Sequence, residues 1–227
     1  MLDSKDLAKK IKIHALEMTH KANSSHIGTC LSMADILAVL YSEVLNYNPK
    51  NPLWDSRDRL VLSKGHGTAI LYSVLCEVGF FESKDLDTFC CNDSYFTGHV
   101  NSKVPGIEVA TGSLGHGLPI ACGIALALKK SKSNSRVFTI SSDGELDEGS
   151  VWESVLFAPH HNLDNLNLVI DYNKIQSFGT IDEVLSLEPL TAKFESFNWS
   201  VSEIDGHNHK ELIDALSKTP VEKNKPS

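Results

Sequence analysis

The chain has 227 residues, of which 41% are hydrophobic, and this is enough to bury one full α/β core in a globular protein. A formal net charge of -8, with no basic cluster, argues against nucleic-acid binding. No apolar run approaches the length of a membrane span, and the first ten residues lack the apolar core of a signal peptide. We therefore expect a cytoplasmic protein that acts neither on nucleic acid nor in a membrane.

The first half of the chain has mainly helical patterns. Apolar side chains recur at helical spacing in residues 3–20, and a capping-box pattern at 32–35 predicts an apolar helix that runs to Leu45. Residues 60–62 have strand composition. They lead into a helix over 68–78 that Gly79 stops, and a short helix is expected over 83–89.

The second half opens with a glycine-rich loop, residues 111–117, which runs into a small-residue helix over 118–130. A strand over 137–140, a helix over 149–161 and a strand over 166–170 follow. We expect a loop over 174–188, a strand over 199–204, a helix that ends at Leu216 and a disordered tail over 221–227. His207 and His209 lack partners for a metal site and are expected at a solvated helix start.

The succession of strand, helix and strand in residues 137–170 predicts a right-handed unit with parallel strands. Parallel neighbours end at the same edge of a sheet, so Asp143 and Asn173 could face one another. Their side-chain oxygens, with a main-chain carbonyl from the next turn, would suit Mg²⁺ or Ca²⁺ and a phosphate group. Taken singly, each of these strand ends is more often only a turn.

The same stretch closely resembles the thiamine diphosphate fingerprint of the transketolase family, through residues 142–149, 152–153 and 171–174. Four further stretches resemble the family in order: 22–28, 62–67, 96–99 and 111–117. The chain departs from the family pattern at three positions. Ser142 replaces the first glycine, where its Cβ would crowd a diphosphate, Ile27 stands where proline is usual, and His116 stands where glutamine is common.

The resemblance implies an α/β fold of three layers, with a mostly parallel sheet and helices on both faces. It implies that residues 1–227 form the diphosphate-binding domain, without its last strand, and that the pyrimidine-binding domain is on another chain. It also implies roles for individual residues: His26, His66 and His99 as catalytic residues; His66, Gly112, Leu114, Asp143, Gly144, Glu148, Asn173 and Ile175 as cofactor-binding residues; and Asp143, Asn173 and the Ile175 carbonyl as ligands of the metal ion.

By the same resemblance, the cofactors are thiamine diphosphate and Mg²⁺, with Ca²⁺ or Mn²⁺ as other candidates. The chain would be an enzyme subunit that transfers a two-carbon ketol unit from a ketose phosphate to an aldose phosphate. Its partner would be a C-terminal transketolase subunit, with two copies of this chain in a heterotetramer. Two alternatives remain open: acyl or ketol transfer on a specialised substrate, and a non-catalytic assembly subunit.

Overall fold

The structure is a computed structural model that describes residues 3–227. It contains helices together with a parallel sheet, which confirms the predicted α/β class. The chain divides into two compact units. The helical unit comprises the described residues up to Arg57, Gly65–Gly112 and Ile204–Ser217; the sheet unit comprises Asp58–Lys64, Ser113–Glu203 and Lys218–Ser227.

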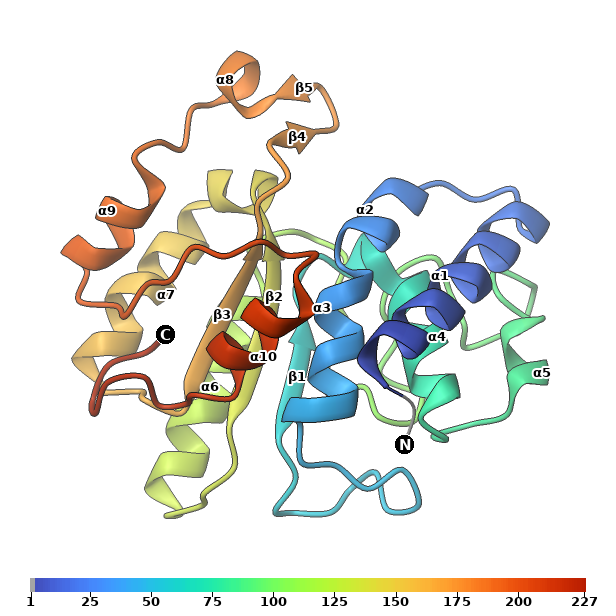
Figure 1. The fold of residues 1–227 in the computed structure, drawn as a ribbon, viewed down its shortest axis with the longest axis horizontal. Helices are drawn as coiled ribbons and strands as arrows, with labels where there is room; N and C mark the ends of the chain where they lie inside the picture. Colours follow the sequence, from blue (N-terminus) through green and yellow to red (C-terminus); the bar gives the residue numbers. More distant parts are fainter. Residues whose placement is uncertain (1–2) are drawn as a thin grey trace. The chain divides into compact units, whose positions relative to one another are not determined.

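The helical unit is assembled around its first helix, α1. The Asp3 carboxylate caps α1 by accepting a hydrogen bond from the Lys5 backbone N–H at 3.1 Å. The helix buries Leu7, Ile11 and Ala15 and contacts both α3 and α4. Figure 1 labels the α-helices of this unit, which are α1 Ser4–Lys21, α2 Ile27–Ser32, α3 Ala34–Val39, α4 Thr68–Glu77, α5 Ser83–Leu86 and α10 His209–Leu216. The unit also contains the π-helix η1 Leu40–Val44 and the 3-10 helix η2 Gly65–Gly67.

The predicted helix over 32–45 is present as α3 followed by η1, which together run from Ala34 to Val44. Its expected cap is wrong, because the N-cap residue of α3 is Met33 and Ser32 is the last residue of a further helix, α2, that begins at Ile27. Burial of Cys30, Met33 and Leu37 continues one apolar stripe through this region, so packing decided where the helices begin.

The sheet unit contains three parallel strands in the order β1-β2-β3: β1 Arg59–Leu62, β2 Val137–Ser142 and β3 Leu166–Asp171 (Figure 1). Every residue of β1 and β2 is buried, as is typical of parallel strands. In the register of β2 with β3, Ser142 pairs with Asp171. The residues that follow these two positions therefore leave the sheet at the same edge.

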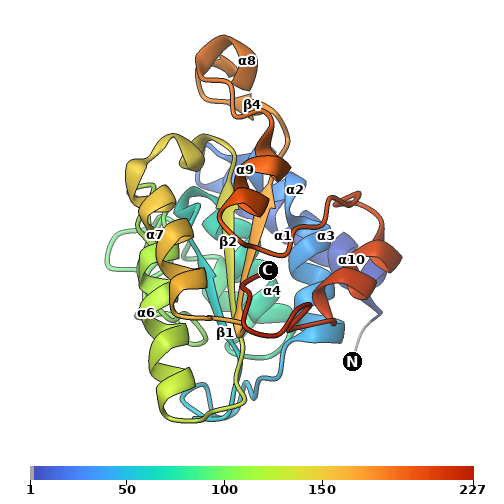
Figure 2. The same ribbon diagram turned by 90° about the vertical axis from the view of Figure 1, so that its left-hand side faces the viewer.

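Two helices pack side by side in this unit, α6 Gly117–Lys130 and α7 Gly149–His160 (Figure 2). Helix α6 contacts all three strands, and the Asn165 side chain donates to the Ala125 carbonyl at 3.0 Å. Between β2 and α7 the chain makes a single 3-10 turn, η3 Gly144–Asp147. This turn carries the acidic stretch that the sequence places after the strand.

The expected loop over 174–188 contains regular structure. It has a small antiparallel hairpin, β4 Ile175–Gln176 with β5 Gly179–Thr180, and a short helix, α8 Ile181–Val184. A capping box between Thr180 and Glu183 starts α8. A further helix that the sequence did not predict, α9 Leu190–Ser196, follows.

The predicted strand over 199–204 is wrong, since these residues have no regular structure. Trp199 is instead held by its buried indole, which donates to the Val155 carbonyl at 2.8 Å. The expected disorder of the tail is also wrong. Ser227 lies on the open edge of β3, where its N–H donates to the Leu166 carbonyl at 3.1 Å and its carbonyl accepts from Leu168 at 2.7 Å.

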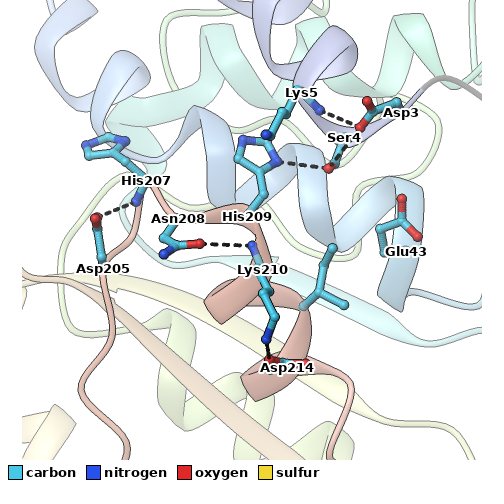
Figure 3. Close-up of a pocket in the computed structure, with 11 residues that line it drawn as sticks. Asp3, Ser4, Lys5, Glu43, Asp205, His207, Asn208, His209, Lys210 and Asp214 are labelled. Atoms are coloured by element: carbon cyan, nitrogen blue, oxygen red, sulfur yellow. Dashed lines mark hydrogen bonds and ion pairs between the residues drawn. The ribbon is translucent and has the colours of Figure 1, made fainter.

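A cavity of about 590 Å³ in the helical unit lies at the start of α10 (Figure 3). His209 was expected in solvent, but its side chain is only 10% exposed and bonds to Ser4 Oγ and to the Asp35 carboxylate. His207 is 63% exposed, as expected at a solvated start, yet it also contacts Asp35 at 2.8 Å. Burial opposes ionisation of Asp35, but hydrogen bonds from His207 and Lys12 bring the pKa of its carboxyl below the usual value.

Across residues 3–227, the helices are too short or too polar to cross a bilayer.

Candidate functional site

Asp143 is the first residue after β2, and it is 2% exposed. Its Oδ1 accepts a hydrogen bond from the Gly144 N–H at 2.8 Å, and its Oδ2 accepts one from the Lys174 N–H at 2.8 Å. Burial raises the pKa of the Asp143 carboxyl above its ordinary value, although these N–H donors oppose the shift. The Lys174 bond ties the end of β2 directly to the segment that follows β3.

Asn173 follows the end of β3 by two residues, and its Oδ1 accepts a hydrogen bond from the Ile175 N–H at 3.0 Å. The structure therefore places Asp143 and Asn173 at adjoining strand ends, as the parallel register requires. A carboxylate oxygen that accepts one N–H bond still has a lone pair for a cation. Within residues 3–227, no group of three or more His, Cys, Asp or Glu side chains could hold a metal ion. The predicted ligand set instead combines one acid with amide and carbonyl oxygens, which is a hard-oxygen set that fits Mg²⁺.

A buried donor lies beside Gly144, the residue expected to contact a diphosphate. The Gln176 side chain packs against it, so that a Cβ on Gly144 would meet Gln176 Cδ at 3.3 Å. The Gln176 Nε2 is buried and has no hydrogen-bond partner among residues 3–227. An unpaired amide donor next to the Gly144 backbone fits a phosphate oxygen, and no sequence pattern had singled out Gln176.

The three histidines predicted to be catalytic come together in the helical unit. The ring of His26 lies 5.3 Å from that of His66 and 5.9 Å from that of His99, measured between centroids. They come from the residue before α2, from η2 and from the loop before Val100. Partial burial lowers the pKa of His26, and the neighbouring His99 lowers it further.

The backbone around this histidine cluster requires small residues. A Cβ on Gly112 would lie 3.3 Å from Cδ2 of His99, and one on Gly65 would lie 2.4 Å from the Thr111 carbonyl oxygen. Ile27 is the first residue of α2, a position that proline also favours, so isoleucine there is compatible with the helix start.

The remaining predicted cofactor residues are on the sheet unit. Leu114 is half-buried and precedes Gly115, whose backbone is in the left-handed region at φ +83°. A Cβ on Gly115 would lie 2.7 Å from Cβ of Glu148, an exposed residue at the start of α7. His116 is exposed at the start of α6 and makes no capping hydrogen bond with its side chain.

Glu145 is a second residue of the site that no sequence pattern had singled out. It lies in the acidic turn after β2, and its side chain is completely buried. Its Oε1 accepts hydrogen bonds from Ser63 Oγ at 2.5 Å and from the Gly115 N–H at 2.8 Å.

Comparison with known proteins agrees with this architecture. The family described as "Transketolase, thiamine diphosphate binding domain" matches residues 3–227. The solved structure of transketolase from Campylobacter jejuni superposes with a TM-score of 0.92 at 36% identity, covering 100% of this chain and 37% of that one. This chain therefore spans little more than a third of the length of that enzyme.

Two shorter relatives are similar over nearly the whole chain. One is the 6-deoxy-6-sulfo-D-fructose transketolase subunit SqwG of Clostridium sp. (strain MSTE9), which is 40% identical over 227 residues, covering 100% of this chain and 82% of the relative. The other is a subunit of the apulose-4-phosphate transketolase of Actinobacillus succinogenes, 41% identical over 216 residues, covering 95% of this chain and 78% of the relative.

Fold, strand-end residues and family match together define an α/β protein of the thiamine diphosphate-binding class. Within that class, the chain belongs to the transketolase family.

Proposed function

We propose that this chain is the diphosphate-binding subunit of a two-component transketolase. It transfers a two-carbon ketol unit from a ketose phosphate to an aldose phosphate, together with a partner subunit that carries the pyrimidine-binding domain. Two copies of the chain sit in a heterotetramer in the cytoplasm. Residues 1–227 act as the diphosphate-binding domain of that enzyme.

The observation that carries this proposal is the family match together with the names of two relatives. The chain matches the thiamine diphosphate-binding domain over residues 3–227, and the two relatives named as transketolase subunits are covered over 82% and 78% of their lengths. Relatives named as subunits imply that the remaining part of the enzyme is on another chain.

In this proposal, Asp143, Asn173 and the Ile175 carbonyl hold Mg²⁺, with Ca²⁺ or Mn²⁺ as substitutes. Gly144 and His66 contact the diphosphate, and Gly112 and Leu114 line the thiamine ring. Glu148 joins an acidic network that reaches the neighbouring subunit. When bound, thiamine diphosphate supplies the carbon nucleophile that allows the bond next to a ketose carbonyl to break and re-form.

The histidine cluster handles protons. An imidazole that is neutral near pH 7 can accept a proton from a sugar hydroxyl and return it to a carbonyl oxygen. The lowered pKa of His26 favours this neutral form. We assign His26 and His99 to the hydroxyl and carbonyl oxygens of the substrate, and His66 to the cofactor as well as to catalysis.

The experiment is to combine the purified chain with its partner subunit, thiamine diphosphate and Mg²⁺, and to follow two-carbon transfer by mass spectrometry. The donors should include a ketose phosphate and a 6-deoxy-6-sulfo ketose, because one relative is named for such a sugar. We expect transfer from a ketose phosphate. Cofactor binding without transfer from any donor would refute the activity, and no cofactor binding by the complex would refute the site.

A further inference from the structure

Glu145 connects three segments of the sheet unit that are far apart in the sequence. Its Oε1 accepts from Ser63 Oγ at the end of β1 and from the Gly115 N–H in the glycine-rich loop, at 2.5 Å and 2.8 Å. The side chain is completely buried in η3, just after β2. One carboxylate oxygen thus ties the loop before α6 to the ends of two neighbouring strands.

Gly115 is held from both sides. Its N–H donates to Glu145, and its carbonyl accepts from Ser150 Oγ at 2.7 Å. The packing leaves little room, since a Cβ on Gly115 would lie 2.6 Å from Ser150 Oγ and one on Gly117 would lie 2.2 Å from Ser63 Oγ. The backbone of the loop therefore has one tightly specified arrangement here.

The second carboxylate oxygen of Glu145 indicates that stability alone does not explain a glutamate at this position. Its Oε2 is buried and has no hydrogen-bond partner among residues 3–227. A buried acceptor without a donor costs stability, and an apolar side chain of similar size would avoid that cost. What only Glu145 supplies is an acceptor at the position of the Gly115 N–H.

We propose that Glu145 is a positioning residue for the cofactor, which fixes the peptide of Gly115 and thereby presents the preceding Leu114 to thiamine diphosphate. This inference rests on the proposed function of the site. In this scheme Glu145 acts through the Gly115 peptide, because its Oε1 accepts hydrogen bonds from Ser63 Oγ and the Gly115 N–H.

The test uses Glu145→Met, which keeps the volume and removes the acceptor, and Glu145→Gln, which keeps an oxygen for both hydrogen bonds. Two measurements are made on each: amide hydrogen exchange of residues 111–117 in the free full-length chain, and calorimetric binding of thiamine diphosphate with Mg²⁺ to the complex with the partner subunit. We expect Glu145→Met to speed exchange at Gly115 and to weaken binding, each by about tenfold or more, and Glu145→Gln to stay within about threefold of the parent.

Asp58→Asn is the matched control. Asp58 is also a buried acid of the sheet unit, but it binds Arg136 just before β2, at the opposite end of the strands. The Asp58→Asn variant should have a lower melting temperature, with amide exchange at Gly115 and affinity for thiamine diphosphate unchanged. If Glu145→Met does not fold, Ser150→Ala removes the bond to the Gly115 carbonyl and should change the same two measurements.

The outcomes separate the two proposals. Unchanged exchange and affinity in Glu145→Met, equal losses in Glu145→Gln and Glu145→Met, or equal losses in Asp58→Asn would each overturn the positioning role. A parent complex that binds no thiamine diphosphate would overturn the proposed function instead, while the exchange measurement on the free chain would still decide whether Glu145 orders the loop.

Discussion

The Lys64 ammonium and the Asp171 carboxylate lie 2.5 Å apart, and their side chains are only 1% and 7% exposed. Lys64 follows the end of β1 by two residues, and Asp171 is the last residue of β3. The pair therefore spans the carboxyl edge of the sheet, on either side of Asp143. Breaking a buried ion pair leaves one uncompensated charge in the interior.

We predict that Lys64→Met destabilises the chain by about 3–5 kcal/mol, because it leaves Asp171 buried without its cation. The double variant Lys64→Met with Asp171→Leu should regain most of that loss. Urea unfolding measures both. Lys225→Met, which breaks a more exposed pair with Glu222, should cost far less, because solvent screens that pair. A loss of similar size in Lys64→Met and Lys225→Met would contradict the prediction.

Asp143→Asn should abolish the Mg²⁺ dependence of cofactor binding. The substitution removes the only carboxylate of the proposed ligand set and puts an amide donor against one of the backbone N–H groups of Gly144 and Lys174. We expect affinity for thiamine diphosphate with Mg²⁺ to fall at least about 100-fold, measured by calorimetry on the assembled complex. The control is Asp147→Asn, an exposed acid in the same turn, and equal losses in both variants would show that general charge rather than coordination matters.

The pKa of His26 should lie below the usual histidine value, because partial burial disfavours the imidazolium and His99 adds a smaller repulsion. His99→Gln should raise it only part of the way, since the larger cause remains. The folded state then binds fewer protons than the unfolded state just below pH about 6.5, so the contribution of His26 to stability decreases as pH falls through that range. Titration of the ring protons by NMR measures the pKa, and a midpoint at or above the ordinary value would refute this prediction.

Ser142→Gly tests the departure from the family fingerprint. Ser142 is 8% exposed, and its Oγ accepts from the Glu145 N–H at 3.3 Å. Removing the side chain should cost about 1 kcal/mol through the lost bond and the added backbone freedom, while relieving the crowding expected for a diphosphate. We therefore expect a lower melting temperature together with tighter binding of thiamine diphosphate. Ser142→Ala loses the hydroxyl but keeps the Cβ, so it should show the first effect without the second.

Much of the sheet unit could be predicted from local patterns. The apolar runs at 137–140 and 166–170 predicted β2 and β3, and helical spacing predicted α7 between them. The same reasoning wrongly predicted a strand over 199–204. A β-branched and aromatic run forms a strand only where a neighbouring strand offers a full ladder of backbone hydrogen-bonding groups. Here the segment makes one such bond, from Ser200 to Pro226.

Some residues of the candidate site could be predicted from the sequence, and others could not. Asp143 and Asn173 were predictable because parallel strands end at one edge, whatever the details of packing. Glu145 and Gln176 were not, since nothing in an acidic turn or a short hairpin shows which polar side chain will be buried.

Residue order alone was enough to predict the succession β2, α7 and β3 and the acid and amide at the strand ends, because these depend on periodicity and on the edge at which parallel strands end. The three histidines were expected only from the resemblance to the family. The folded chain was needed to show that Glu145 turns inward to Ser63 and Gly115, that Lys64 pairs with Asp171, and that the last residue lies along β3. Buried polar groups need hydrogen-bond partners once water is excluded. Here those partners come from segments that are distant in the sequence, so only the folded structure shows them.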